Sequence, residues 1–195
     1  MRNYLLAALL LLSMCAGATD LSHPALGFSF KIPDTFKDFP EGKTDPKTVF
    51  SYCIPPKGGE MPHMFLVVTR MGGVLPREPI KKSDLRPGMD ADISTTGWNG
   101  FDINQIVVRQ NANGVKLVEL DVQVPLKPEA VQLALVADEK DLPEMHTTMA
   151  AMLASLTGKT NWLTSSERAE KLGEAIGYMI VPAILLIYFI RKRSA

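Results

Sequence analysis

Apolar and polar side chains alternate in several short stretches of the chain, the pattern of β-strands that bury one face. The clearest stretch is 28–32, where Phe28, Phe30 and Ile32 share one face and Pro33 follows. Five further stretches have a strand pattern, namely 47–54, 64–71, 101–110, 115–124 and 130–137. The pair Asn113-Gly114 lies between two of them and predicts a hairpin turn. The pattern therefore predicts an antiparallel sheet.

A helical spacing begins after Asp141. Apolar residues recur there at intervals of three to four, the spacing of an amphipathic helix, at Leu142, Met145, Met149, Met152, Leu153 and Leu156. Asp141 and Glu144 have the spacing of an acidic capping box, and Pro143 is tolerated in a first turn. Gly158 is the expected end of the helix.

Glycine and proline interrupt the stretch 72–97, which includes Gly72-Gly73, Pro76, Pro79 and Pro87-Gly88. We expect a long surface segment with one short helix near 83–93. Binding sites often lie on such segments.

The N-terminal end has the three parts of a secretory signal: Arg2, an apolar run, and Ala16-Gly17-Ala18. Cleavage after Ala18 is expected. Two alternatives remain open. The apolar run could be retained as a signal anchor, or Cys15 could be lipidated, although Met14 is larger than the residue that usually precedes a lipidated cysteine.

The C-terminal end is a second apolar run. Residues 175–190 carry no charge and precede the cations Arg191-Lys192-Arg193. A helix of that length spans about 24 Å, so a membrane-spanning helix over 174–190 must use a few flanking residues to cross a ~30 Å hydrocarbon core. The adjacent cations predict that residues 191–195 lie in the cytoplasm.

Charge narrows the possible functions. Residues 19–173 hold 17 basic and 20 acidic side chains, a net charge of about −3, which gives no electrostatic basis for nucleic-acid binding. Cys53 would be the one cysteine left after removal of the signal, so no intrachain disulfide is expected. Its apolar surroundings predict a buried, unreactive thiol.

The residues of the common catalytic and cofactor motifs are missing. We therefore predict no catalytic residue, no cofactor and no enzymatic activity. One metal candidate is His63 with Met61 and Met64, because thioethers and imidazole suit Cu(I). The simpler alternative is that Met64 fills the core. His146 is expected to be an ordinary residue of the helix surface.

A partner-binding candidate is the aromatic pair Trp98 and Phe101, which flanks Asn99-Gly100. The pair could be presented to a partner protein. The alternative is that Trp98 covers one end of the core.

The order of these segments resembles the PsbP-like and DcrB-like superfamily. The resemblance covers about residues 21–158 and rests on the stretches Gly27–Pro33, Trp98-Asn99-Gly100, Val124-Pro125-Leu126, Ala130–Leu133 and Met152–Leu156. It implies an antiparallel sheet covered by helices and a non-enzymatic binding or assembly role, and it assigns no functional residue. A C-terminal membrane anchor is a departure from that superfamily.

Together these features predict an α+β protein with an antiparallel sheet packed by helices. The expected parts are a signal (1–18), an exported domain (19–158), a linker (159–173), a transmembrane helix (174–190) and a tail (191–195). The expected function is binding of a protein or envelope component outside a bacterial inner membrane. The alternative is a ligand- or metal-binding accessory protein of envelope transport.

Overall fold

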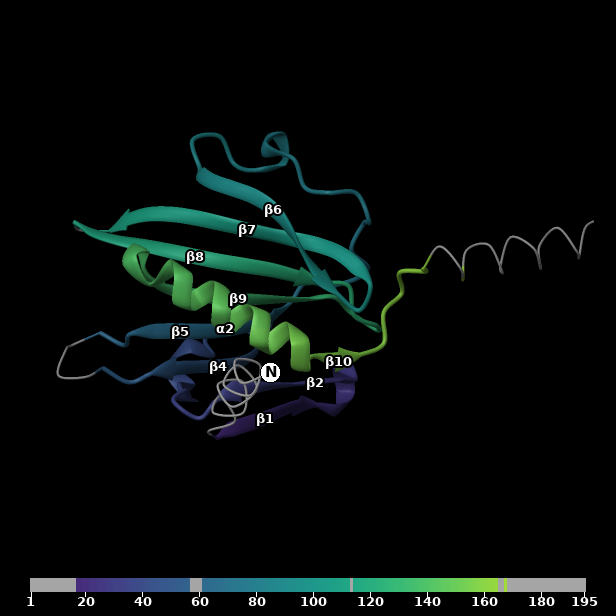
Figure 1. Cartoon of the computed structure of the whole chain (residues 1–195), viewed down its shortest axis with the longest axis horizontal. Helices are drawn as coiled ribbons and strands as arrows, with labels where there is room; N and C mark the ends of the chain where they lie inside the picture. The colour runs from purple at the N-terminus through teal and green to yellow at the C-terminus, as the bar shows by residue number, and fades with distance from the viewer. Residues whose placement is uncertain (1–16, 57–60, 113, 165–166, 168–195) are drawn as a thin grey trace, which may run out of the picture. The chain divides into compact units, whose positions relative to one another are not determined.

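The computed structural model describes residues 17–56, 61–112, 114–164 and 167, and Figure 1 shows the β-sheets and the helix that they form. All strand pairs are antiparallel, in a seven-stranded sheet of order β3-β4-β5-β9-β8-β7-β6 and a three-stranded sheet of order β1-β2-β10. The strands are β1 (Ala18–His23), β2 (Phe28–Pro33), β3 (Lys37–Asp38), β4 (Thr48–Ile54), β5 (Met64–Arg70), β6 (Asp90–Trp98), β7 (Phe101–Ala112), β8 (Val115–Val124), β9 (Val131–Asp138) and β10 (Thr157–Gly158). The helix α2 spans Leu142–Ser155. The predicted α+β class with an antiparallel sheet is confirmed for these residues, with one α-helix against the sheets where several were expected.

All six predicted strands are present, with bounds within about two residues of the predicted ones. The hairpin of β7 and β8 turns at Gly114, where φ is +85°, a conformation that favours glycine. The alternation in β2 also has the predicted cause, because Phe28, Phe30 and Ile32 are all buried.

The helix predicted near 83–93 is wrong. That stretch holds a single 3-10 turn, Lys82–Asp84, followed by β6, which pairs with β7 along its whole length. Strand β6 lies at the edge of the seven-stranded sheet, so one of its sides has no neighbouring strand among the described residues. An edge strand tolerates the polar residues that alternate along β6. Because β6 is not buried on both faces, it lacks the apolar pattern from which a central strand can be predicted.

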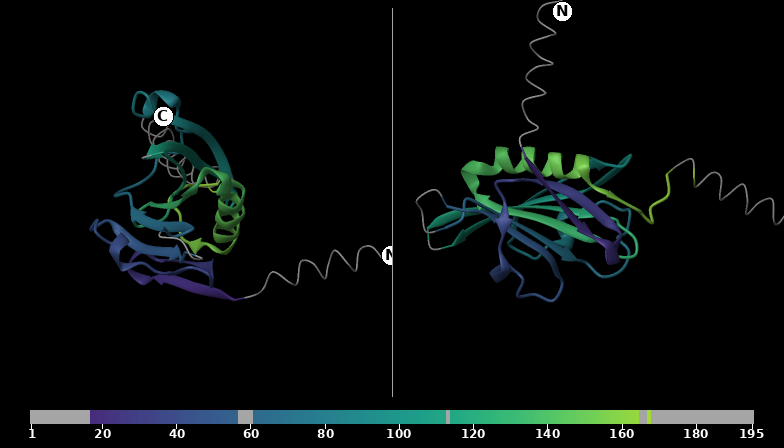
Figure 2. Two further views of the ribbon diagram at one scale, coloured as in Figure 1. Left: turned by 90° about the vertical axis from the view of Figure 1, so that its left-hand side faces the viewer. Right: turned by 90° about the horizontal axis from the view of Figure 1, so that it is seen from below.

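The core has α2 and β2 on one side and one face of the seven-stranded sheet on the other. Both views of Figure 2 show this arrangement. We call that face of the sheet the inner face. Many of its fully buried side chains come from β5, β8 and β9, including Leu66, Leu120, Val122, Leu133 and Leu135. The predicted helix stripe is confirmed, since Met145, Met149 and Met152 are at most 1% exposed.

The C-terminal end of α2 differs from the prediction. The helix ends at Ser155, and Gly158 lies in β10, which pairs with β2. Ser155 accepts a hydrogen bond from the Lys31 N–H at 2.9 Å, so the helix end is tied to the small sheet. A Cβ at Gly158 would lie 2.6 Å from Leu126 Cδ2, and this close approach explains the glycine better than a helix cap does.

The opposite side of the seven-stranded sheet is called the outer face below. Strand register places Phe65 beside Val136, Glu119 beside Val136, and Asp121 beside Ala134 on this face. The segment between β5 and β6 covers the part of it that belongs to β6 and β7, where Ile80 and Leu85 pack on a small apolar cluster of Ala91, Ile106 and Val108.

The compact domain continues slightly beyond residue 158. The Lys127 N–H donates to the Lys159 carbonyl at 2.8 Å, Thr160 bridges to Leu126, and the unit ends at Asn161. The predicted membrane-spanning segment 174–190 and nearly all of the signal 1–18 lie outside the described residues. Within the described part, no helix combines the length and the apolar character needed to cross a membrane.

Candidate functional site

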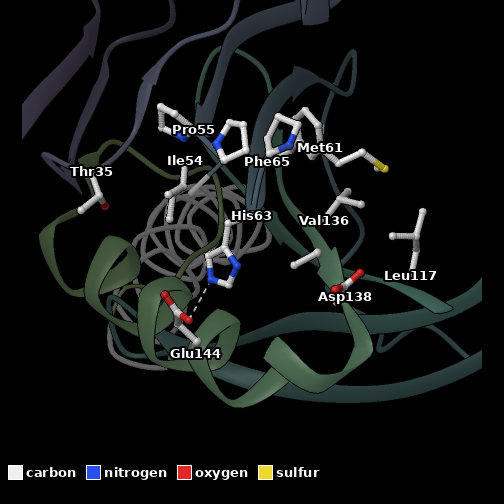
Figure 3. Close-up of a pocket in the computed structure, with 13 residues that line it drawn as sticks. Thr35, Ile54, Pro55, Met61, His63, Phe65, Leu117, Val136, Asp138 and Glu144 are labelled. Carbon is white, nitrogen blue, oxygen red and sulfur yellow. Dashed lines mark hydrogen bonds and ion pairs between the residues drawn. The ribbon is translucent and has the colours of Figure 1, made fainter. Parts of the chain in front are cut away.

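A cavity of about 530 Å³ lies where the ends of four strands approach the start of α2 (Figure 3). Its apolar lining comes from Ile54, Pro55, Pro56, Met61, Pro62, Phe65, Leu117, Val136 and Ala137. Its polar lining consists of Thr35, His63, Asp138 and Glu144. A largely apolar cavity of this size with a few polar groups at one side has the character of a ligand site.

His63 occupies the junction between the sheet and the helix. Its N–H donates to the Ile54 carbonyl at 3.0 Å, which extends the pairing of β4 with β5 by one residue and fixes the backbone. The ring Nε2 lies 3.1 Å from Glu144 Oε2, and Nδ1 lies 3.7 Å from Asp141 Oδ2. Figure 3 shows the ring and the Glu144 carboxylate pointing toward each other.

Asp141 and Glu144 do not form the predicted capping box. Asp141 makes no side-chain cap hydrogen bond, and its φ of −93° and ψ of 2° are not the extended dihedrals of an N-cap. The reason is that the chain enters α2 from a 3-10 turn, Glu139–Asp141, and is already coiled at this residue. Both carboxylates instead face His63, and a protonated imidazole would pair with both.

The three groups are the right types to hold a divalent metal. One ligand atom from each of His63, Asp141 and Glu144 lies within 4.8 Å of the others. Nitrogen with two carboxylate oxygens suits Zn²⁺ or Mn²⁺ better than Cu(I). The two ring nitrogens face different carboxylates, however, and the contact of His63 Nε2 with Glu144 accounts for part of the cluster without a metal.

The candidate metal residues from the sequence are only partly brought together. Met61 lines the cavity with His63 but is 56% exposed, whereas Met64 has no exposed surface and belongs to the core. Met64 therefore fills the core, which was the simpler alternative. The groups found close to His63 are acids that the sequence pattern had placed in a helix cap.

Sequence reasoning missed a second pair of acids, Glu119 and Asp121, which stand two residues apart on the outer face of β8. Asp121 is 8% exposed, and its Oδ1 has no hydrogen-bond partner among the described residues. Burial and the neighbouring Glu119 charge raise the pKa of Asp121 to about 7, against a smaller opposing effect of the Gln132 hydrogen bond. Burial also raises the pKa of Glu119.

Trp98 and Phe101 are both 4% exposed, so neither is presented on the surface. The Trp98 indole donates to the Leu156 carbonyl at 3.2 Å, which joins the β6–β7 turn to the end of α2. The packing alternative therefore describes the pair, and partner binding through exposed aromatic rings is not what the structure shows.

Cys53 is a free, buried cysteine, as predicted. Burial, with a smaller contribution from the negative charge of Glu41, raises the pKa of its thiol. A raised pKa lowers the fraction of reactive thiolate at neutral pH.

Three solved structures are similar to this chain. A Bacteroides thetaiotaomicron protein aligns over 75% of this chain with a TM-score of 0.54 and 11% identity, and the aligned part is 50% of that protein. The Ran-binding protein Mog1p of Saccharomyces cerevisiae aligns over 73% of this chain and 95% of its own, with a TM-score of 0.51 and 9% identity. LpqN of Mycobacterium tuberculosis, described as involved in cell envelope biogenesis, aligns over 72% of this chain and 90% of its own, with a TM-score of 0.47 and 16% identity.

No protein-family profile and no curated protein sequence matches the chain. At these low identities the similar structures show the fold alone. The fold is that of the Mog1/PsbP-like proteins, so the resemblance seen in the sequence is confirmed at the level of the fold.

Proposed function

We propose that this chain is a membrane-anchored, non-enzymatic binding module whose cavity accepts a short segment of an envelope protein. The segment would place one apolar side chain in the cavity and a basic side chain at its margin. The observation that carries the proposal is the composition of the cavity, which is apolar inside and acidic at one side.

The charges around the cavity favour a basic partner. Glu144 is 53% exposed at the side chain and Asp138 is 43% exposed, so both can meet a ligand at the surface. Each already has a partner in the protein, Asp138 with Lys140 at 2.8 Å and Glu144 with His63 at 3.1 Å, so both contribute negative charge beside the cavity. A ligand cation close to exposed acids also associates faster through electrostatic attraction.

The anchor belongs to the same proposal. Residues 174–190 would cross the bacterial inner membrane once, with the domain outside and residues 191–195 in the cytoplasm. Tethering would hold the cavity near envelope proteins and raise their effective concentration, so a single small cavity would suffice for binding in the cell. Mog1p is a Ran-binding protein, which is compatible with a protein partner for this fold.

Replacing Val136 by lysine should strongly weaken binding at the cavity. Val136 lines the cavity and is partly exposed, so the new side chain would bring a cation into the apolar space without opening the core. We expect a loss of affinity of at least about tenfold, equal to about 1.4 kcal/mol. The measurement is fluorescence anisotropy of a labelled, capped Gly-Leu-Ser-Arg-Gly peptide with the full-length chain.

The matched control is Val115→Lys, which adds the same charge at an exposed position of β8 that does not line the cavity. Its affinity for the peptide should stay within about twofold of that of the unchanged protein, because an exposed charge away from the cavity has a small effect on binding. Equal losses in both variants, or no peptide binding by the unchanged protein, would contradict the proposal.

The orientation can be tested with a reporter fused after Ala195. We expect cytoplasmic reporter activity, because the cations of residues 191–193 keep that end on the cytoplasmic side. A fusion after Asn161, at the end of the compact domain, is the control and should be active outside. Periplasmic activity of the Ala195 fusion would show that the proposed orientation is wrong.

A further inference from the structure

The acid pair Glu119 and Asp121 lies directly beside the cavity. On β8, Glu119 is the next outer-face residue after Leu117, and the register sets it opposite Val136 of β9. Leu117 and Val136 both line the cavity. Side chains on opposite residues of neighbouring strands have Cβ atoms about 5 Å apart, so the cavity lining and the acid pair are continuous.

The pair has no positively charged partner in the described part of the chain. The groups that act on the two carboxyls are each other and the Gln132 amide. The residues opposite them are uncharged: Val108 and Ile106 on β7, and Val136 and Ala134 on β9. The acids therefore lie on an otherwise apolar part of the outer face.

Such an arrangement costs stability when the acids are ionised. A buried carboxylate without a cation or enough hydrogen bonds is strongly disfavoured. Asp121 is 8% exposed and its Oδ1 lacks a hydrogen-bond partner within the described residues, while Glu119 is partly exposed and can be reached from outside. A hydrogen-bond donor with a positive charge is the group that this site lacks.

We propose that Glu119 and Asp121 bind the cationic group, an ammonium or guanidinium, of the segment whose apolar side chain occupies the cavity. This inference rests on the proposed function and adds the residues that recognise the basic side chain. Val136 lies opposite Glu119, and Asp121 follows Glu119 by two residues on β8. Two residues of a strand span about 7 Å. An extended segment with a basic residue two positions after the apolar one would match that distance.

Binding at the pair should release protons. The pKa of Asp121 is raised to about 7, so this carboxyl is close to half protonated at pH 7. A bound cation favours the ionised form and would displace the proton. Affinity for the basic segment should therefore rise as the pH increases from 6 to 8.

The test is isothermal titration of the full-length chain with Gly-Leu-Ser-Arg-Gly and with the same peptide carrying neutral citrulline in place of arginine. We expect the arginine peptide to bind about tenfold more tightly, as a charge-assisted hydrogen bond allows. Repeating the titration in buffers with different ionisation enthalpies measures the protons released. Glu119→Gln and Asp121→Asn should each remove most of the preference for arginine and most of the proton release. The affinity for the citrulline peptide should not change.

Asp102→Asn is the matched control, because Asp102 is an exposed acid on the neighbouring strand β7 and the substitution likewise replaces a carboxyl by an amide. It should leave the preference for arginine unchanged. Circular dichroism of each variant checks that the fold is kept.

The outcomes separate this inference from the proposed function. If Val136→Lys strongly weakens binding but the two acid variants keep the preference for arginine, the cavity proposal stands and the acid pair is not the cation site. If neither peptide binds, the proposed function fails, and benzamidine, an apolar ring with an amidinium, decides the inference. Benzamidine binding that is lost in Asp121→Asn supports a cation site, and binding that is unaffected or absent in the unchanged protein overturns it.

Discussion

Replacing Met149 by alanine is expected to lower the free energy of unfolding by about 2–5 kcal/mol, the range for truncating a large buried aliphatic side chain. Met149 lies in the middle of α2 and is 1% exposed, between Met145 and Met152, which have no exposed surface. The helix packs on β2, β8 and β9, so the cavity left by the truncation would lie between the helix and strands of both sheets. Urea unfolding followed by circular dichroism of the full-length chain measures the effect.

His146→Ala is the matched control on the same helix. His146 is exposed, so removing its side chain leaves no cavity, and the change should stay within about 0.5 kcal/mol. A loss at Met149 no larger than that at His146 would show that α2 is not an integral part of the core.

The sequence pattern predicted the strands that bury a face and the helix that covers them. Strands β2, β5, β8 and β9 alternate or are continuously apolar because their buried side chains are packed on both sides of the core. Strand β6 was missed because an edge strand can keep polar residues on both faces. The two-residue strands β3 and β10 could not be predicted, since they exist only through pairing with a distant partner, Cys53 with Lys37 and Phe28 with Gly158.

The candidate site was predicted less well, for a reason visible in its residues. His63 was singled out, but with methionines close to it in sequence, whereas its actual neighbours Asp141 and Glu144 are about 80 residues away. Their i, i+3 spacing equally fits a helix cap, so spacing alone favoured the wrong role. The pair Glu119 and Asp121 was overlooked because acids on the polar side of an alternating strand are normally solvated. The folded structure shows that Asp121 is buried and Glu119 only partly exposed.

The stability of this domain should fall as the pH rises from about 4 to about 7 through the contribution of Asp121. The folded pKa of Asp121, about 7, lies above its ordinary value of 3.8, so the folded protein holds a proton that the unfolded chain releases. The stabilisation is fully present below pH 4 and is lost as the pH rises through 7. At about 1.4 kcal/mol per pKa unit the whole shift corresponds to about 4 kcal/mol. Because the coupled Glu119 shares the shift, we expect a loss on the order of 2 kcal/mol from Asp121.

Asp121→Asn should remove this dependence, because the amide has a similar shape but cannot ionise. The variant is expected to be about as stable as the unchanged protein at pH 4.5 and more stable by on the order of 2 kcal/mol at pH 8, as measured by urea unfolding at both values. The comparison with the unchanged protein cancels the titration of the acids that do not interact with Asp121, and Asp102→Asn, which alters an exposed carboxylate, should show no such difference. Equal effects of Asp121→Asn at both pH values would mean that Asp121 is ionised without cost in the folded protein, and the need for a cation at this site would disappear with it.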